Sequence, residues 1–128
     1  MIIGWGGNNG TTVTNGILAN RLSLKWETKR GEVQANYHGS LTQCSTTYLG
    51  QDEKGTTYVA PFKSLLPMVN PNDIEISGWD ISKMNIYEAT RRAKVLEPTM
   101  YTQLKEYTEK MVPLPAVFDL SFVAPNQE

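Results

Sequence analysis

The strongest constraint on the fold is a glycine-rich segment that stands between an apolar stretch and a helical pattern. Residues 1–3 are apolar, and residues 4–10 read Gly-Trp-Gly-Gly-Asn-Asn-Gly. After this segment, apolar side chains recur at helical spacing at Val13, Ile17, Leu18 and Leu22. The order predicts a buried strand that ends at residue 3, a glycine loop, and a helix over residues 11–22.

The spacing Gly4-x-Gly6-x-x-x-Gly10 is a variant of the dinucleotide-binding fingerprint. In that fingerprint one glycine permits a tight turn, one lets the backbone approach a pyrophosphate, and one lets helix and strand pack closely. The helix N-terminus then offers free N–H groups to phosphate. Here the third glycine comes one residue late, and Asn9 occupies its usual place. An ordinary glycine-rich turn is the alternative interpretation.

A dinucleotide site also needs an acid at the end of the second strand, about 20 residues further on, to bind the adenosine ribose. Residue 30 is Arg30, so the usual spacing fails. Asp80 ends a predicted strand over residues 73–80. Its long separation from the glycine loop is explained if residues 23–70 are inserted between the first helix and the second strand. A carboxylate there favours NAD over NADP, because it would repel a 2′-phosphate. The alternative is that Asp80 only caps the turn before the next helix.

The remaining pattern predicts two helices and a third strand. Asn85 and Glu88 have the spacing of a capping box, and Pro98 suits the first turn of a second helix. Residues 117–123 are apolar enough to form a strand. We therefore expect an α/β fold, a Rossmann-type domain with a parallel sheet, incomplete at both ends.

Composition excludes several classes of protein. The 128 residues carry 12 Lys and Arg against 13 Asp and Glu, so a strongly basic nucleic-acid binder is not expected. Apolar runs are far shorter than the about 20 residues that span a bilayer. One cysteine and no cationic leader favour a cytoplasmic setting. His38 and Cys44 stand without catalytic partners, and no metal-ligand cluster is visible.

Several blocks, in order along nearly the whole chain, resemble the myo-inositol-1-phosphate synthase family, its eukaryotic branch most. The resemblance begins with Gly4-Trp5-Gly6-Gly7-Asn8-Asn9-Gly10-Thr11-Thr12. It continues at residues 35–43 (Ala-Asn-Tyr-His-Gly-Ser-Leu-Thr-Gln), 65–73, 78–82 (Gly-Trp-Asp-Ile-Ser), 92–96 and 112–115. An unrelated Rossmann dehydrogenase would require all these ordered blocks to be coincidence.

The resemblance implies an NAD-dependent, cytoplasmic homotetramer that converts glucose 6-phosphate to inositol phosphate. In that family NAD oxidises the sugar, an enolate closes the ring by an aldol step, and the hydride is returned. Carried over by position, the cofactor-contacting residues are Gly6, Gly7, Asn8, Asn9, Asp80, Ala116, Val117 and Gln127. Ala116 departs from the expected serine and has no hydroxyl that could contact the cofactor, and Cys44 replaces an alanine.

The family's chains are several times longer than this one, and their lysine-rich catalytic centre follows the matched region. We therefore expect residues 1–128 to form part of an NAD-binding domain, with no catalytic or metal-ligating residue and with the catalytic and tetramerisation region absent. The expected partners include neither nucleic acid nor membrane. The alternative function is a short, non-catalytic nucleotide-binding or interaction module.

Overall fold

The protein contains a three-stranded parallel sheet in a computed structural model that describes residues 1–122. The strands lie in the order β1 (Ile2–Ile3), β6 (Gly78–Asp80) and β7 (Leu114–Pro115). α1 (Asn8–Arg21) follows β1, and α4 (Ile86–Ala93) follows β6. Parallel strands joined in this order through helices form half of a Rossmann fold, which confirms the predicted α/β class.

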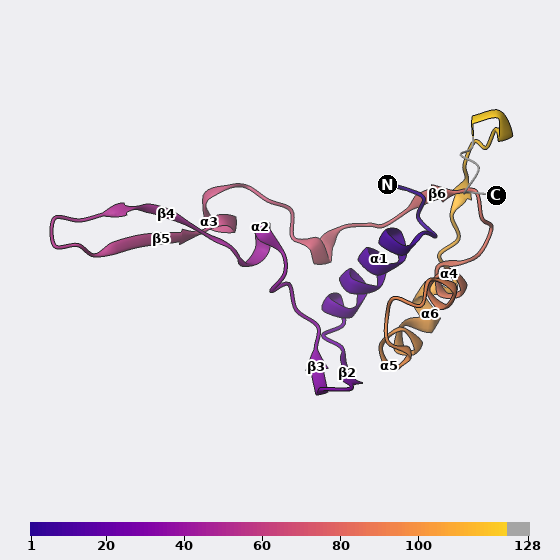
Figure 1. The fold of residues 1–128 in the computed structure, drawn as a ribbon, viewed down its shortest axis with the longest axis horizontal. Coiled ribbons are helices and arrows are strands. Elements are labelled where there is room, and N and C mark those ends of the chain that lie inside the picture. Colours follow the sequence, from indigo (N-terminus) through magenta and orange to yellow (C-terminus); the bar gives the residue numbers. More distant parts are fainter. Residues whose placement is uncertain (123–128) are drawn as a thin grey trace.

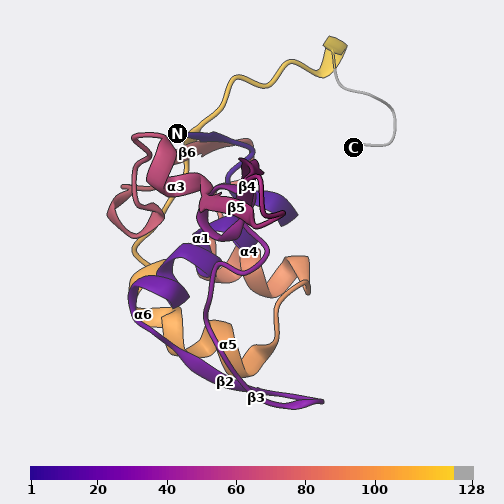
Figure 2. The ribbon, with the colours of Figure 1, turned by 90° about the vertical axis from the view of Figure 1, so that its left-hand side faces the viewer.

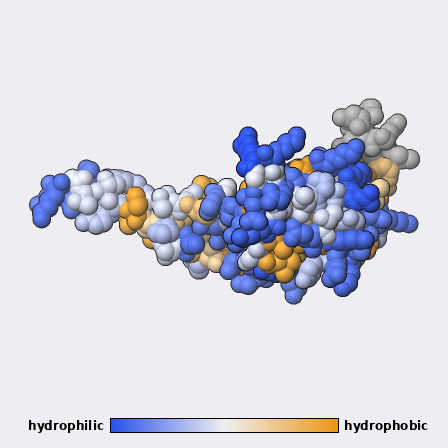
Figure 3. All heavy atoms as spheres, turned by 90° about the horizontal axis from the view of Figure 1, so that it is seen from below, coloured by the Kyte–Doolittle hydropathy of each residue, from blue (hydrophilic) through white to orange (hydrophobic). Residues whose placement is uncertain are grey.

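The segment between α1 and β6 holds two antiparallel hairpins that do not join the parallel sheet. The hairpin strands are β2 (Lys25–Thr28) with β3 (Gly31–Gln34), and β4 (Thr46–Gln51) with β5 (Thr57–Pro61). Short helical turns accompany them at α2 (Leu41–Cys44), α3 (Phe62–Leu65) and η1 (Pro71–Asp73). The β4–β5 hairpin extends away from the body as an arm (Figures 1 and 3).

Short helical segments follow α4. The first three lie where a second helix was predicted from Pro98, and the last lies where a third strand was expected. They are α5 (Pro98–Tyr101), η2 (Thr102–Leu104), α6 (Lys105–Thr108) and η3 (Leu120–Phe122). The strand expected at residues 117–123 is wrong over its described part, because β7 forms earlier and pairs with β6.

Side-chain hydrogen bonds of Asp119 support the helical turn η3 that replaces the expected strand. The carboxylate of Asp119 accepts hydrogen bonds from both the backbone N–H and the hydroxyl of Ser121. Bonds of this kind compete with the ladder of a sheet. The Ser121 backbone N–H also holds the pKa of Asp119 below its usual value.

The predicted apolar stripe of α1 is confirmed at its C-terminal end, where Leu18 is buried and Leu22 packs against the apolar core. The first turns of the helix bury a face of polar side chains instead. Val13 is 50% exposed, whereas Thr11, Thr14 and Asn15 are almost completely buried. The Thr14 hydroxyl donates to the Gly10 carbonyl at 2.7 Å. These side chains can be buried because their hydroxyl and amide N–H groups donate to backbone carbonyls one turn earlier.

The same polar face joins α1 to α4. Asn15 Nδ2 donates to the Thr11 carbonyl at 2.8 Å and to Thr90 Oγ1 at 2.9 Å. The predicted capping box at the start of α4 is confirmed, since the side chains of Asn85 and Glu88 each accept the other's backbone N–H. The cap and the buried amide together fix where α4 lies against α1.

A small apolar core lies between α1 and the helical segments α5 and η2, and Figure 2 shows these elements below the sheet. It contains Leu18, Ala19, Met100 and Leu104. On the sheet, by contrast, Ile3 is 87% exposed and Leu114 is 50% exposed. Parallel sheets are normally covered on both faces, so this sheet presents apolar surface that its described helices leave open.

Two glycines of α1 provide a matched test of this packing. A Cβ at Gly10 would lie 2.2 Å from the Trp5 carbonyl oxygen, whereas a Cβ at Gly16 would meet nothing within 4 Å. We expect Gly10→Ala to lower the free energy of unfolding by roughly 1–3 kcal/mol. Gly16→Ala should raise it by about 0.5–1 kcal/mol, because alanine favours the helix. Chemical denaturation measures both, and equal effects would contradict the close approach at Gly10.

Candidate functional site

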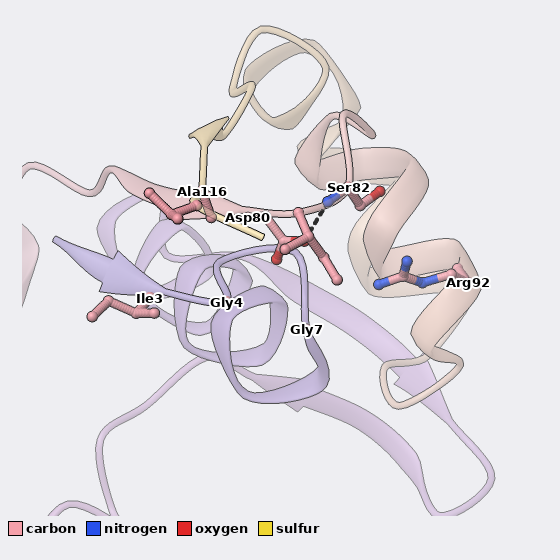
Figure 4. A pocket seen from close by; sticks show the side chains of 9 residues that line it. Ile3, Gly4, Gly7, Asp80, Ser82, Arg92 and Ala116 are labelled. Carbon is pink, nitrogen blue, oxygen red and sulfur yellow. Dashed lines mark hydrogen bonds between the residues drawn. The ribbon is translucent and has the colours of Figure 1, made fainter. Parts of the chain in front are cut away.

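A cleft of ≈ 760 Å³ opens where β1 and β6 end, beside the glycine loop and α4 (Figure 4). Its lining residues come from four parts of the chain: Ile3, Gly4, Gly7, Asp80, Ile81, Ser82, Arg92, Ala116 and Val117. Ligands of open α/β sheets bind outside the carboxyl ends of the strands. The cleft therefore lies where the fold predicts a ligand.

The three glycines of the fingerprint have distinct structural roles. Gly4 has φ +73°, a left-handed conformation that suits the tight turn after β1. A Cβ at Gly6 would lie 3.2 Å from Asp80 Oδ2, so glycine here lets the loop approach that carboxylate. Gly10 packs against the Trp5 backbone. The predicted tight turn and close helix packing are confirmed.

The start of α1 presents unbonded backbone donors beside the cleft. Gly7 is the N-cap residue and supplies no side chain to cap the helix, and the first turn contains no acidic residue. Within residues 1–122, the N–H groups of Asn8, Asn9 and Gly10 have no hydrogen-bond acceptor. Free N–H groups at the positive end of a helix dipole suit a phosphate.

Asp80 is 9% exposed and ties the glycine loop to the turn after β6. Its Oδ2 accepts the Gly6 N–H at 2.8 Å, and its Oδ1 accepts the Ser82 N–H at 2.8 Å. The Ser82 bond is the turn-capping role that the sequence left open. Each carboxylate oxygen can accept a further hydrogen bond, so binding of a ribose at Asp80 stays a prediction.

Arg92 reaches the loop from α4, and the sequence analysis did not assign it to the site. Its Nη2 donates to the Gly6 carbonyl at 2.8 Å, and its guanidinium points toward the loop (Figure 4). No local pattern marks this contact, because Gly6 and Arg92 are 86 residues apart in the sequence. One turn earlier on α4, Ala89 lies beside the same loop, with its Cβ 3.6 Å from the place of a Cβ at Gly6.

Two of the remaining expected site residues line the cleft. Ala116 and Val117 line it, and the Ala116 N–H donates to the Asp80 carbonyl at 3.0 Å. Val117 is 99% exposed. Asn8 and Asn9 are exposed at the start of α1, and Gln127 lies outside the described residues.

The weaker candidates lie elsewhere. His38 and Cys44 are exposed and do not line the cleft. Among residues 1–122, no group of three or more His, Cys, Asp or Glu side chains could hold a metal ion. Over the same residues, no helix has the length and apolar character needed to cross a membrane.

The parallel sheet, the glycine loop and the acid at the end of the second sheet strand define a Rossmann-type dinucleotide-binding fold. Comparison with known families agrees, since an NAD-binding family model described as myo-inositol-1-phosphate synthase matches residues 1–128. The chain belongs to this family, and its cofactor is NAD.

Individual relatives are similar over the whole chain. Inositol-3-phosphate synthase 1-B of Xenopus laevis is 55% identical over 128 residues, which are 100% of this chain and 23% of the relative. The synthase of Sesamum indicum is 54% identical over 127 residues, 99% of this chain and 25% of the relative. The crystal structure of inositol-3-phosphate synthase from Caenorhabditis elegans superposes with TM-score 0.89 at 48% identity, over 98% of this chain and 25% of that one. The chain thus spans about a quarter of the length of these relatives.

Asp80→Ala should affect both stability and cofactor binding. The variant loses the acceptor of two backbone N–H groups, and charged hydrogen bonds contribute about 1.5–3 kcal/mol. We expect a lower melting temperature and a dissociation constant for NAD raised about 10–100-fold. Calorimetric titration beside a melting curve measures both in the full-length protein.

Asp73→Ala is the matched control, because Asp73 is exposed and lies outside the cleft. It should change neither quantity. Asp80→Ala could instead lower the melting temperature and leave the NAD affinity unchanged. Asp80 would then stabilise only the glycine loop and the turn after β6, and it would not bind the ribose.

Proposed function

We propose that this chain is the NAD-binding portion of a cytoplasmic, homotetrameric enzyme that converts glucose 6-phosphate to myo-inositol phosphate. The main support is the family match over residues 1–128 together with a cleft that has the chemistry of a dinucleotide site. Free backbone donors suit phosphate, and a buried carboxylate suits ribose hydroxyls. The cleft is therefore proposed as the cofactor site of the reaction.

The residues present fit NAD, and each has a proposed part in holding it. Gly6 and Gly7 let the backbone approach the pyrophosphate, which the N–H groups of Asn8 and Asn9 bind. Asp80 accepts hydrogen bonds from the adenosine ribose, and the further contacts come from Ala116, Val117 and Gln127. When bound, NAD supplies reversible hydride transfer, so the overall conversion of the sugar phosphate is an isomerisation.

We assign residues 1–128 to part of an NAD-binding domain in which residues 23–70 are an insertion. Two observations support this assignment: β2 to β5 stand apart from the parallel sheet, and Ile3 and Leu114 of that sheet remain exposed. The catalytic and tetramerisation regions belong to the part of the relatives that this chain does not span. No residue of this chain is therefore proposed as catalytic.

The test separates cofactor binding from turnover. The full-length protein should bind NAD and form inositol phosphate from glucose 6-phosphate. The 128-residue chain alone should give no inositol phosphate above a matched blank, as expected also for a non-catalytic binding module. Turnover by the short chain would overturn the domain assignment, and a full-length protein that binds NAD without turnover would favour the module.

A loop variant tests the cleft itself. Gly6→Val places a branched side chain where a Cβ already comes within 3.2 Å of Asp80 Oδ2, so NAD binding in the full-length protein should fall at least tenfold. Gly39→Val is the control, since a Cβ at Gly39 meets nothing within 4 Å. Equal NAD affinity of the two variants would contradict the proposed site.

A further inference from the structure

Both backbone groups of Gly6 are held by side chains from distant elements. The Gly6 N–H donates to Asp80 Oδ2 at 2.8 Å, and the Gly6 carbonyl accepts from Arg92 Nη2 at 2.8 Å. Asp80 ends β6 and Arg92 lies in the last turn of α4. The orientation of Gly6 therefore depends on the Asp80 carboxylate at its N–H and on the Arg92 guanidinium at its carbonyl.

Arg92 gives the Gly6 carbonyl a hydrogen-bond donor that helix α1 does not provide. Because α1 begins at Asn8 with Gly7 as its N-cap, Gly6 lies before the helix. The Gly7 carbonyl accepts the Thr11 N–H at 3.0 Å, whereas within residues 1–122 the Gly6 carbonyl accepts only from Arg92. A carbonyl next to the free N–H groups of α1 is thereby held in one orientation.

Arg92 also brings a positive charge to the cleft, and it forms no ion pair among the described residues. The ion pairs within residues 1–122 are Lys25–Glu32 and Lys105–Glu109. Arg92 lines the cleft together with Gly7 and Asp80. A guanidinium has five N–H donors, so the bond to Gly6 leaves others for an anion.

We propose that Arg92 is a positioning residue of the cofactor cleft: it holds the Gly6 carbonyl, and so the glycine loop, in the conformation that binds a pyrophosphate. This inference rests on the proposed NAD site and adds a residue to it. The charge of Arg92 favours the same ligand, because it lies beside the helix end that receives the phosphates. The adenosine part of the ligand does not depend on Arg92.

The matched control is the preceding residue of α4. Arg91 carries the same charge, but its guanidinium lies 5.9 Å from the centre of the Tyr87 ring, and it does not line this cleft. Arg91→Ala and Arg92→Ala therefore remove the same charge from the same helix. Only the second removes the bond to Gly6.

The first measurement is calorimetric titration of the full-length variants with NAD, ADP-ribose and adenosine. Arg92→Ala should weaken NAD and ADP-ribose about tenfold and leave adenosine unchanged, whereas Arg91→Ala should change none of them. Arg92→Lys keeps the charge and a donor, so it should restore most of the affinity. An equal loss in the Arg91 and Arg92 variants, or an equal loss for adenosine, would overturn the proposal.

The second measurement needs no ligand and does not depend on the proposed function. Hydrogen exchange at the Gly6 and Gly7 amides should be at least several-fold faster in Arg92→Ala than in Arg91→Ala. Unchanged exchange would overturn the positioning role. If the unaltered full-length protein failed to bind NAD, the proposed function would be wrong while the exchange result still decided the role of Arg92. Arg92→Gln replaces Arg92→Ala in both measurements if Arg92→Ala does not fold.

Discussion

The hydrogen bond from the Gly6 N–H to the buried carboxylate of Asp80 connects the two parts of the chain that form the cleft. Gly6 follows β1, Asp80 ends β6, and parallel pairing brings Ile2 opposite Gly78 and Ile3 opposite Trp79. A buried charge is costly unless it is bonded, and here both carboxylate oxygens accept backbone N–H groups. The order of the sheet and the shape of the loop therefore depend on each other.

The close approaches in this region depend on the absence of side chains. A Cβ at Gly78 would lie 2.1 Å from the Ile2 carbonyl oxygen, and one at Gly10 would lie 2.2 Å from that of Trp5. Trp5 is 3% exposed, and its indole N–H donates to Thr14 Oγ1 at 2.8 Å, which fixes the loop to α1. The free N–H groups at the start of α1 are consequently held on a rigid support, which reduces the entropy lost when a ligand binds.

A buried polar contact joins the two helices beside the cleft, in addition to their apolar packing. Asn15 of α1 and Thr90 of α4 are joined by a buried hydrogen bond, and Arg92 lies on the last turn of the same α4. A buried amide finds its partner in only one arrangement, so the bond specifies how α4 lies against α1. That arrangement decides whether Arg92 reaches Gly6.

The sequence by itself determined the features that arise from local chemistry. The glycine loop, the helix after it, the capping box at Asn85 and the acid at the end of a strand depend on residues that are neighbours in the chain. Only the tertiary structure decided the buried face of α1, the early third strand and the part taken by Arg92. Asn15 is buried where it bonds to Thr90, β7 pairs where β6 offers an edge, and Arg92 meets a carbonyl 86 residues away. Contacts between distant segments leave no periodic pattern in the sequence, since each is fixed by how the whole chain packs.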